Sequence, residues 1–124
     1  MKITGFNPMI VSADAENLIR LFEELGFEKR HAPVIEMAGG DISGIRMKDG
    51  NGNYVDMADQ ASIPRDAIYI RINVDQFEEA YDILTRHGFQ NSRGEVAILT
   101  DSAKAATMVS PSGLAILLVE HIRE

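Results

Sequence analysis

The chain has 124 residues, 45% of them hydrophobic and 25% charged, with a net charge of −7 and no cysteine. This composition is that of one ordinary globular domain, and it excludes disulfide bridges, thiolate metal sites and cysteine nucleophiles. The lack of cysteine and of a long apolar segment predicts a cytoplasmic protein with no membrane partner, and the scattered Lys and Arg residues predict no nucleic-acid partner.

The first predicted elements are a short strand at 9–14 and a helix whose apolar residues follow helical spacing. Asp14 is a suitable N-cap for this helix, and Gly26 supplies the left-handed residue that commonly follows a helix end. Further strands are predicted at 34–38 and 43–47. A glycine-rich turn at 49–53 then leads into an apolar strand that begins at Tyr54.

The second half of the chain repeats this order. A strand at 70–75 ends in Asp75, which with Glu78 has the spacing of a capping box, and the following helix ends at Gly88. Strands are predicted at 95–99 and 106–109, and a turn at 110–113 leads into the last strand. Each half therefore reads as β-α-β-β-β.

The spacing of four glycines supports an internal repeat. Gly26 and Gly88 lie 62 residues apart (88 − 26), and Gly52 and Gly113 lie 61 apart (113 − 52). The repeat predicts an α+β fold with module one at 1–60, a proline-containing linker at 61–65 and module two at 66–124. Neither module buries both its helix and its sheet alone, so one domain over 1–124 is expected.

This ordered set of motifs resembles the glyoxalase/bleomycin-resistance/extradiol-dioxygenase, or vicinal oxygen chelate, superfamily. The stretches that carry the resemblance are 9–27, 51–57 and 110–120. The resemblance implies that the two modules form an incomplete barrel whose concave cleft holds a ligand or metal. It also implies a homodimer, because members often build each cleft from modules of two chains.

Metal-using members place one His or Glu ligand on the first strand and one on the last strand of each module. Carried onto this chain, these positions fall on Phe6, Asp56, Tyr69 and Leu117. Only Asp56 is a normal ligand, whereas three or four protein ligands are usual. A shift of one residue, which brings in Asn7, does not restore a ligand set. We therefore expect no metal and no other cofactor.

Strand alternation predicts which side chains face the cleft. The predicted ligand-binding residues are Phe6, Asp56, Tyr69, Arg71 and Leu117, and Pro8 and Ile10 share the predicted face of Phe6. The aromatic pair would either stack on a planar ligand or fill the cleft and leave no cavity. Arg71 is interpreted either as an anion-recognising fork or as a residue of structural role, paired with Asp56 in an internal ion pair or exposed at a sheet edge. The same interpretations apply, with a weaker case, to Arg46.

The predicted function is metal-free, non-catalytic binding of a small molecule, as in the sequestration or resistance branch of the superfamily. The alternative is an enzyme. It would be a divergent metal-dependent lyase, isomerase or dioxygenase, or a metal-free acid/base catalyst that uses Asp56, Tyr69 or His31. A third possibility is a degenerate module that serves only in dimerisation or regulation.

Overall fold

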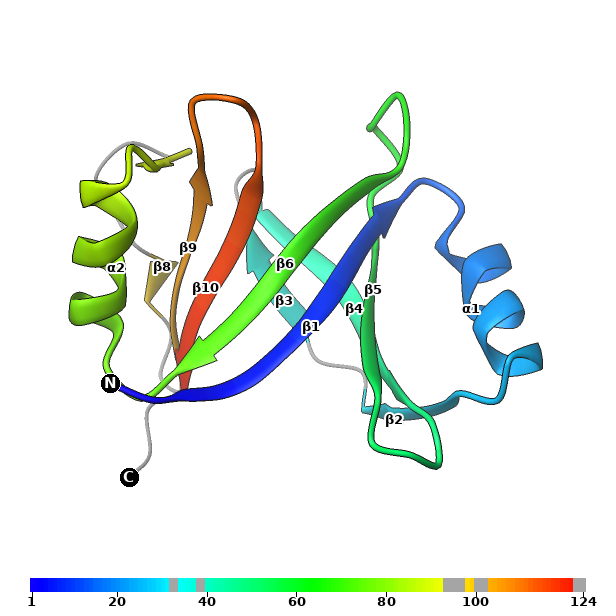
Figure 1. Ribbon diagram of the computed structural model, residues 1–124. Coiled ribbons are helices and arrows are strands. Elements are labelled where there is room, and N and C mark those ends of the chain that lie inside the picture. The colour runs from blue at the N-terminus through cyan, green and yellow to red at the C-terminus, as the bar shows by residue number, and fades with distance from the viewer. Residues whose placement is uncertain (32–33, 38–39, 93–97, 100–102, 122–124) are drawn as a thin grey trace. The chain divides into compact units, whose positions relative to one another are not determined.

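The computed structural model describes residues 1–31, 34–37, 40–92, 98–99 and 103–121 (Figure 1). The chain divides into two compact units, one formed by Asn7–Ile68 and the other by Met1–Phe6 with Tyr69–Glu124. The predicted linker at 61–65 lies inside the first of these units, and the first six residues belong to the second. No helix in the described ranges combines the length and the apolar character that a membrane crossing requires.

The 7–68 unit holds a sheet and one helix. Its elements in chain order are β1 (Ile3–Ser12), α1 (Ala15–Glu24), β2 (Glu28–His31), β3 (Val34–Met37), β4 (Gly40–Lys48) and β5 (Tyr54–Asp59). β1 pairs in parallel with β5, and β4 lies antiparallel between β5 and β2. β3 forms an antiparallel hairpin with β4.

α1 covers one face of this sheet, beside β5 in Figure 1. Three buried residues, Met47, Val55 and Met57, form the centre of the core on that face. Half-buried apolar residues pack around them: Ile10, Leu18, Ile19, Phe22, Phe27 and Ile45. The rings of Phe22 and Phe27 meet edge to face with centroids 5.3 Å apart, which fixes the chain where it leaves the helix.

The other unit repeats the arrangement. Its elements are β6 (Ala67–Val74), α2 (Phe77–Arg86), β7 (Gln90–Asn91), β8 (Ile98–Leu99), β9 (Ala103–Val109) and β10 (Ala115–His121). β10 pairs in parallel with β6 and antiparallel with β9, and β9 also pairs with β7 and β8. α2 lies beside this sheet (Figure 1). The buried cluster between them includes Phe77 of α2 and Val74, Met108 and Leu118 of the strands.

The predicted α+β fold with two β-α-β-β-β modules is confirmed. The strand prediction at 34–38 fell on the extra hairpin strand β3, whereas the short strands β2 and β7, which follow each helix, were not predicted. Both short strands are rich in charged or amide residues, so they lack the apolar alternation that marks a strand in a sequence. Part of the predicted strand at 95–99, namely 95–97, lies outside the described residues.

The four repeated glycines have the backbone conformation that the repeat predicts. Their φ angles are positive: 111° at Gly26, 86° at Gly52, 91° at Gly88 and 101° at Gly113. Residues other than glycine rarely adopt such backbone angles. The repeat in the sequence is therefore a repeat of turns that require glycine.

The predicted side-chain caps are wrong at both helices. Asp14 precedes α1 without making a side-chain cap bond, and the residue before α2 is Gln76. The backbone N–H of Phe77 instead donates to Glu120 Oε1 at 2.6 Å, and Asp75 Oδ1 accepts the backbone N–H of Lys2. At α2, residues distant in the sequence thus bond to the Asp75 carboxylate and to the first helix N–H, which local spacing had assigned to each other.

Candidate functional site

The face of the 7–68 sheet opposite α1 carries buried polar side chains. The register places Asp56 beside Met9 on β1 and beside Arg46 on β4, whereas Met57 and Ile45 point to the helix side. Alternation along β1 places Asn7 on the face of Met9. Asn7 is 4% exposed and Asp56 is 2% exposed. Buried polar groups of this kind need hydrogen-bond partners, and here they find one another.

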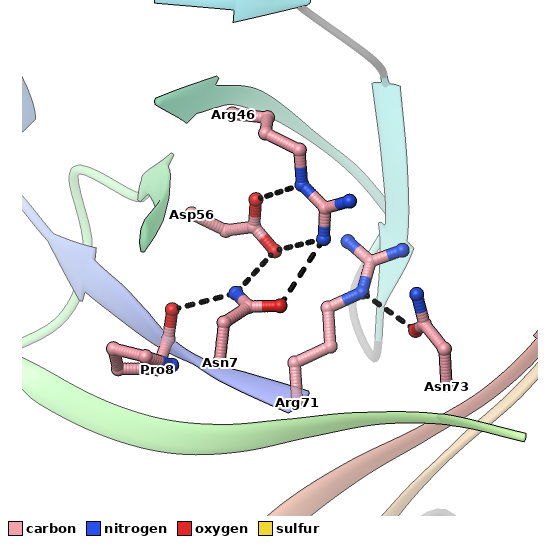
Figure 2. Close-up of polar contacts among 6 residues, drawn as sticks. All are labelled: Asn7, Pro8, Arg46, Asp56, Arg71 and Asn73. Carbon is pink, nitrogen blue, oxygen red and sulfur yellow. Dashed lines mark hydrogen bonds and ion pairs between the residues drawn. The ribbon is translucent and has the colours of Figure 1, made fainter. Parts of the chain in front are cut away.

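Three of these side chains form a closed hydrogen-bonded ring (Figure 2). Arg46 Nε donates to Asp56 Oδ1 at 2.9 Å, and Arg46 Nη2 donates to Asp56 Oδ2 at 3.2 Å. Asn7 Nδ2 donates to the same Oδ2 at 3.0 Å, and Asn7 Oδ1 accepts from Arg46 Nη2 at 3.2 Å. Asn7 thus bridges the carboxylate and the guanidinium, and both oxygens of Asp56 are engaged.

The ion pair is asymmetric in its burial. The side chain of Asp56 is 3% exposed and that of Arg46 is 27% exposed. The hydrogen bond to Asp56 raises the pKa of Arg46, against the opposing effect of burial. A carboxylate in this position is tolerated because a cation and a hydrogen-bond donor accompany it.

Tyr54 lies at the exposed end of the same face. The Arg46 guanidinium carbon is 5.0 Å from the centre of the Tyr54 ring, and Lys48 Nζ is 5.4 Å from it. Lys48 is the cross-strand neighbour of Tyr54, and Arg46 is the next residue on that face of β4. One aromatic ring therefore holds two cations by cation–π contacts.

The second unit has a polar group on the corresponding face of its own sheet. Arg71 Nε donates to Asn73 Oδ1 at 3.1 Å, and both side chains are buried. Leu117 lies beside Arg71 in the register of β10 and β6 and is 2% exposed. Ile72 packs under α2, so the alternation predicted for β6 is confirmed.

The alternation predicted for β1 is wrong. Ile10, which was expected on the cleft face, packs in the core under α1, and Asn7 is the residue that reaches Asp56. Phe6 is 65% exposed, and Tyr69 is half-buried. The partner of Asp56 within its own unit is Arg46, which the sequence favoured less than Arg71. The alternation of residues along a single strand does not reveal how two strands pair, and it is the pairing of β4 with β5 that places Arg46 opposite Asp56.

The residues at the positions that the superfamily uses for metal do not fit a divalent ion. Within the ranges that the structure describes, no three His, Cys, Asp or Glu residues come together as a metal site. Asp56, the one carboxylate at these positions, is already bonded through both oxygens to Arg46 and Asn7. His87 is exposed at the end of α2, and the side chains of His31 and His121 lie outside the described part of the chain.

No protein-family model and no curated protein sequence matches the chain. Solved structures do match it. Methylmalonyl-CoA epimerase from Mycobacterium tuberculosis has a TM-score of 0.74 at 16% identity, over 98% of this chain and 90% of that chain. A mutant of the Streptomyces coelicolor methylmalonyl-CoA epimerase in complex with 2-nitronate-propionyl-CoA has a TM-score of 0.68 at 13% identity, over 98% and 100% of the two chains.

Glyoxalase I from Zea mays has a TM-score of 0.68 at 15% identity. The match covers 98% of this chain but 44% of the maize chain, so this chain spans less than half the length of that protein. At identities this low, the similarity concerns the arrangement of the strands and helices.

Proposed function

Because the chain has the fold of the vicinal oxygen chelate superfamily, we propose that it is a small-molecule binding protein that works without a divalent metal and without catalysis. The observation that carries the proposal is the closed ring of Asn7, Arg46 and Asp56. The ring lies on the sheet face opposite α1, and its guanidinium is the part that is most exposed.

The ring argues against metal binding on physical grounds. A divalent ion at Asp56 would have to displace a charge-assisted pair of hydrogen bonds, and it would then lie next to the guanidinium of Arg46. Like charges at such short range repel strongly where water is excluded. The cation that neutralises Asp56 is therefore one that the protein supplies itself.

The predicted ligand contacts of the second unit belong to this proposal as well. Phe6, Tyr69, Arg71 and Leu117 combine an exposed aromatic ring, a half-buried one, a guanidinium and an apolar side chain. A few polar groups among apolar ones are the usual composition of a small-molecule site. Substitution of Phe6 or Tyr69 by Ala is expected to weaken ligand binding without unfolding the chain.

An enzymatic function is the second candidate, because the solved structures that match include epimerases and a glyoxalase. A metal-dependent enzyme of this kind would need Asp56 as a free ligand. The two candidates therefore predict opposite results when metal ions are added to the purified protein.

Calorimetric titration with Zn²⁺, Ni²⁺ and Mn²⁺ tests the proposal. We expect no stoichiometric binding to the wild-type chain, and methylmalonyl-CoA, used as a probe, should bind equally with and without a chelator and remain unconverted. Stoichiometric metal binding that Asp56→Asn abolishes would overturn the proposal. Asp59→Asn is the matched control, because Asp59 lies on the same strand but is exposed.

The proposal includes a cytoplasmic homodimer. The absence of cysteine suits a reducing compartment, and several large apolar side chains are exposed on the single chain, among them Phe6, Leu25 and Ile68. Twofold dimers are the commonest oligomers. Sedimentation at micromolar concentration is expected to show twice the mass of 13.7 kDa, and a single species of that mass would contradict the dimer.

A further inference from the structure

The guanidinium of Arg46 keeps one amino group out of the ring that it forms with Asp56 and Asn7. Nε and Nη2 make all of its hydrogen bonds to those two residues, and Nη1 makes none with the described residues (Figure 2). The side chain is 27% exposed. Two N–H donors therefore remain on a cation whose orientation the bidentate pair already fixes.

Lys48 adds a second cation on the same face of β4. Among the described residues its ammonium group makes no hydrogen bond and no ion pair, and it lies over the ring of Tyr54. Arg46 and Lys48 both lie within 5.4 Å of the centre of that ring, so this end of the sheet face carries two cations around one side chain. An anion that contacts both cations is stabilised by both charges.

Three acidic residues lie near these cations in the described part of the chain, and none of them bonds to the ammonium group of Lys48. Asp56 is paired with Arg46, and both oxygens of Asp49 accept hydrogen bonds within the following turn. Glu28 on β2 is the cross-strand neighbour of Lys48, but it is exposed and forms no ion pair in the described part of the chain. The ammonium group of Lys48 is thus left without a bonded carboxylate among the described residues, in a chain whose net charge is −7.

We propose that Arg46 and Lys48 form a binding site for an oxyanion, a carboxylate or phosphate group of the ligand, with Tyr54 holding the two cations in position. The inference rests on the proposed small-molecule binding and names the class of ligand. Asp56 and Asn7 are positioning residues, because they orient the guanidinium and leave Nη1 for the ligand. Guanidinium and ammonium donors both suit these oxyanions.

The test is an NMR titration of the complete chain with benzoate, inorganic phosphate and neutral benzamide. The signals followed are the backbone amides and the Arg side-chain Nε–Hε groups. Benzoate or phosphate, or both, should shift the signals of Arg46, Lys48 and Tyr54 in a saturable way, and the stronger of the two identifies the oxyanion as carboxylate or phosphate. Benzamide should not shift them, and added salt should weaken the binding.

Lys48→Met is the main variant, because the ammonium group of Lys48 makes no hydrogen bond with the described residues. It should weaken binding of the anion about twofold to fivefold, the range of an exposed charge pair. Glu28→Gln removes the nearby acid and should strengthen binding about twofold. Lys29→Met is the matched control and should change nothing, because Lys29 pairs with Met47, whose side chain belongs to the core under α1.

The inference is overturned if neither anion shifts these signals, or if Lys48→Met and Lys29→Met bind the anion equally well. It is also overturned if benzamide binds as tightly as benzoate. That result would be compatible with metal-free binding of a small molecule, but it would show that the site does not select an oxyanion. Failure of the proposed function itself would be seen separately, as stoichiometric metal binding in the calorimetric titration.

Discussion

Arg46 and Asp56 lie opposite each other on the antiparallel strands β4 and β5, and the guanidinium contacts both carboxylate oxygens, at 2.9 and 3.2 Å. The carboxylate is almost fully buried, whereas the guanidinium is about one quarter exposed. The pair therefore stabilises the interior of the sheet on one side and presents a cation on the other. The two roles can be separated by experiment.

Removal of Arg46 should destabilise the fold strongly. Arg46→Met leaves the buried carboxylate of Asp56 without its ion-pair partner, and we expect a loss of about 2–4 kcal/mol in the free energy of unfolding, measured with urea. Arg20→Met is the matched control, because Arg20 forms an exposed pair with Glu16 and should lose less than about 0.5 kcal/mol. The double variant Arg46→Met/Asp56→Leu should recover part of the loss, and equal losses in Arg46→Met and Arg20→Met would contradict this account.

The N-terminus of α2 depends on a residue more than forty positions away in the sequence. Glu120 Oε1 accepts the backbone N–H of Phe77 at 2.6 Å, which satisfies a donor that the helix cannot pair internally. Glu120→Ala should cost about 1 kcal/mol in urea unfolding, as the loss of a cap does, and Glu120→Gln should cost less because it keeps an acceptor. If Asp75→Ala lost the hydrogen-exchange protection of the amides near residue 77 and Glu120→Ala did not, Asp75 would be the cap.

Asp49 should contribute a pH-dependent stabilisation of the turn before β5. Hydrogen bonds, first from the side chain and then from the backbone of Asn53, lower the pKa of Asp49 below its ordinary value of 3.8. Because the folded pKa is the lower one, this contribution is present above 3.8 and is lost as the pH falls through the folded pKa. In a carboxyl NMR titration, Asn53→Ala should bring the pKa of Asp49 back towards 3.8. Asn51→Ala should leave it in place, because only the backbone of Asn51 donates.

Gly26 should resist substitution for reasons of backbone geometry. An added Cβ would meet no atom within 4 Å, but the φ angle of 111° is strained for any other residue. Gly26→Ala should therefore cost about 1–2 kcal/mol in thermal or urea unfolding. Gly50→Ala is the control, because its surroundings are equally open and its φ lies outside the left-handed range. Comparable losses of stability in the two variants would show that the φ angle of Gly26 is not the cause.

The modules could be predicted from the sequence because their turns are local. A left-handed residue is a property of one position, so Gly26, Gly52, Gly88 and Gly113 mark the ends of elements without knowledge of the rest of the fold. The resemblance to the vicinal oxygen chelate superfamily, drawn from these landmarks, is confirmed at the level of the fold by the solved structures. The incomplete barrel and its cleft stay predictions.

The candidate site was harder to predict because it depends on three strands at once. Asp56 was singled out as a site position, but its contacts with Arg46 and Asn7 follow from the pairing of β4, β5 and β1. The two faces of β1 were also assigned one residue out of step, because Asn7 is a polar residue on a buried face. An interior amide is the signal that could have shown this, because it requires a polar partner from another strand.

The membership of residues 1–6 in the 69–124 unit has a consequence for the order of folding. The backbone N–H of Lys2 bonds to Asp75 across 73 positions, and the N–H of Asp75 bonds back to the carbonyl of Lys2. During synthesis at about 5–20 residues per second, residues 1–6 therefore wait several seconds for these partners. The 7–68 unit is translated before then, whereas the later unit must bring together residues 73 positions apart, and long closures slow folding. Vectorial synthesis thus favours one order of events, in which residues 1–6 pair with their partners only after the 7–68 unit has been translated.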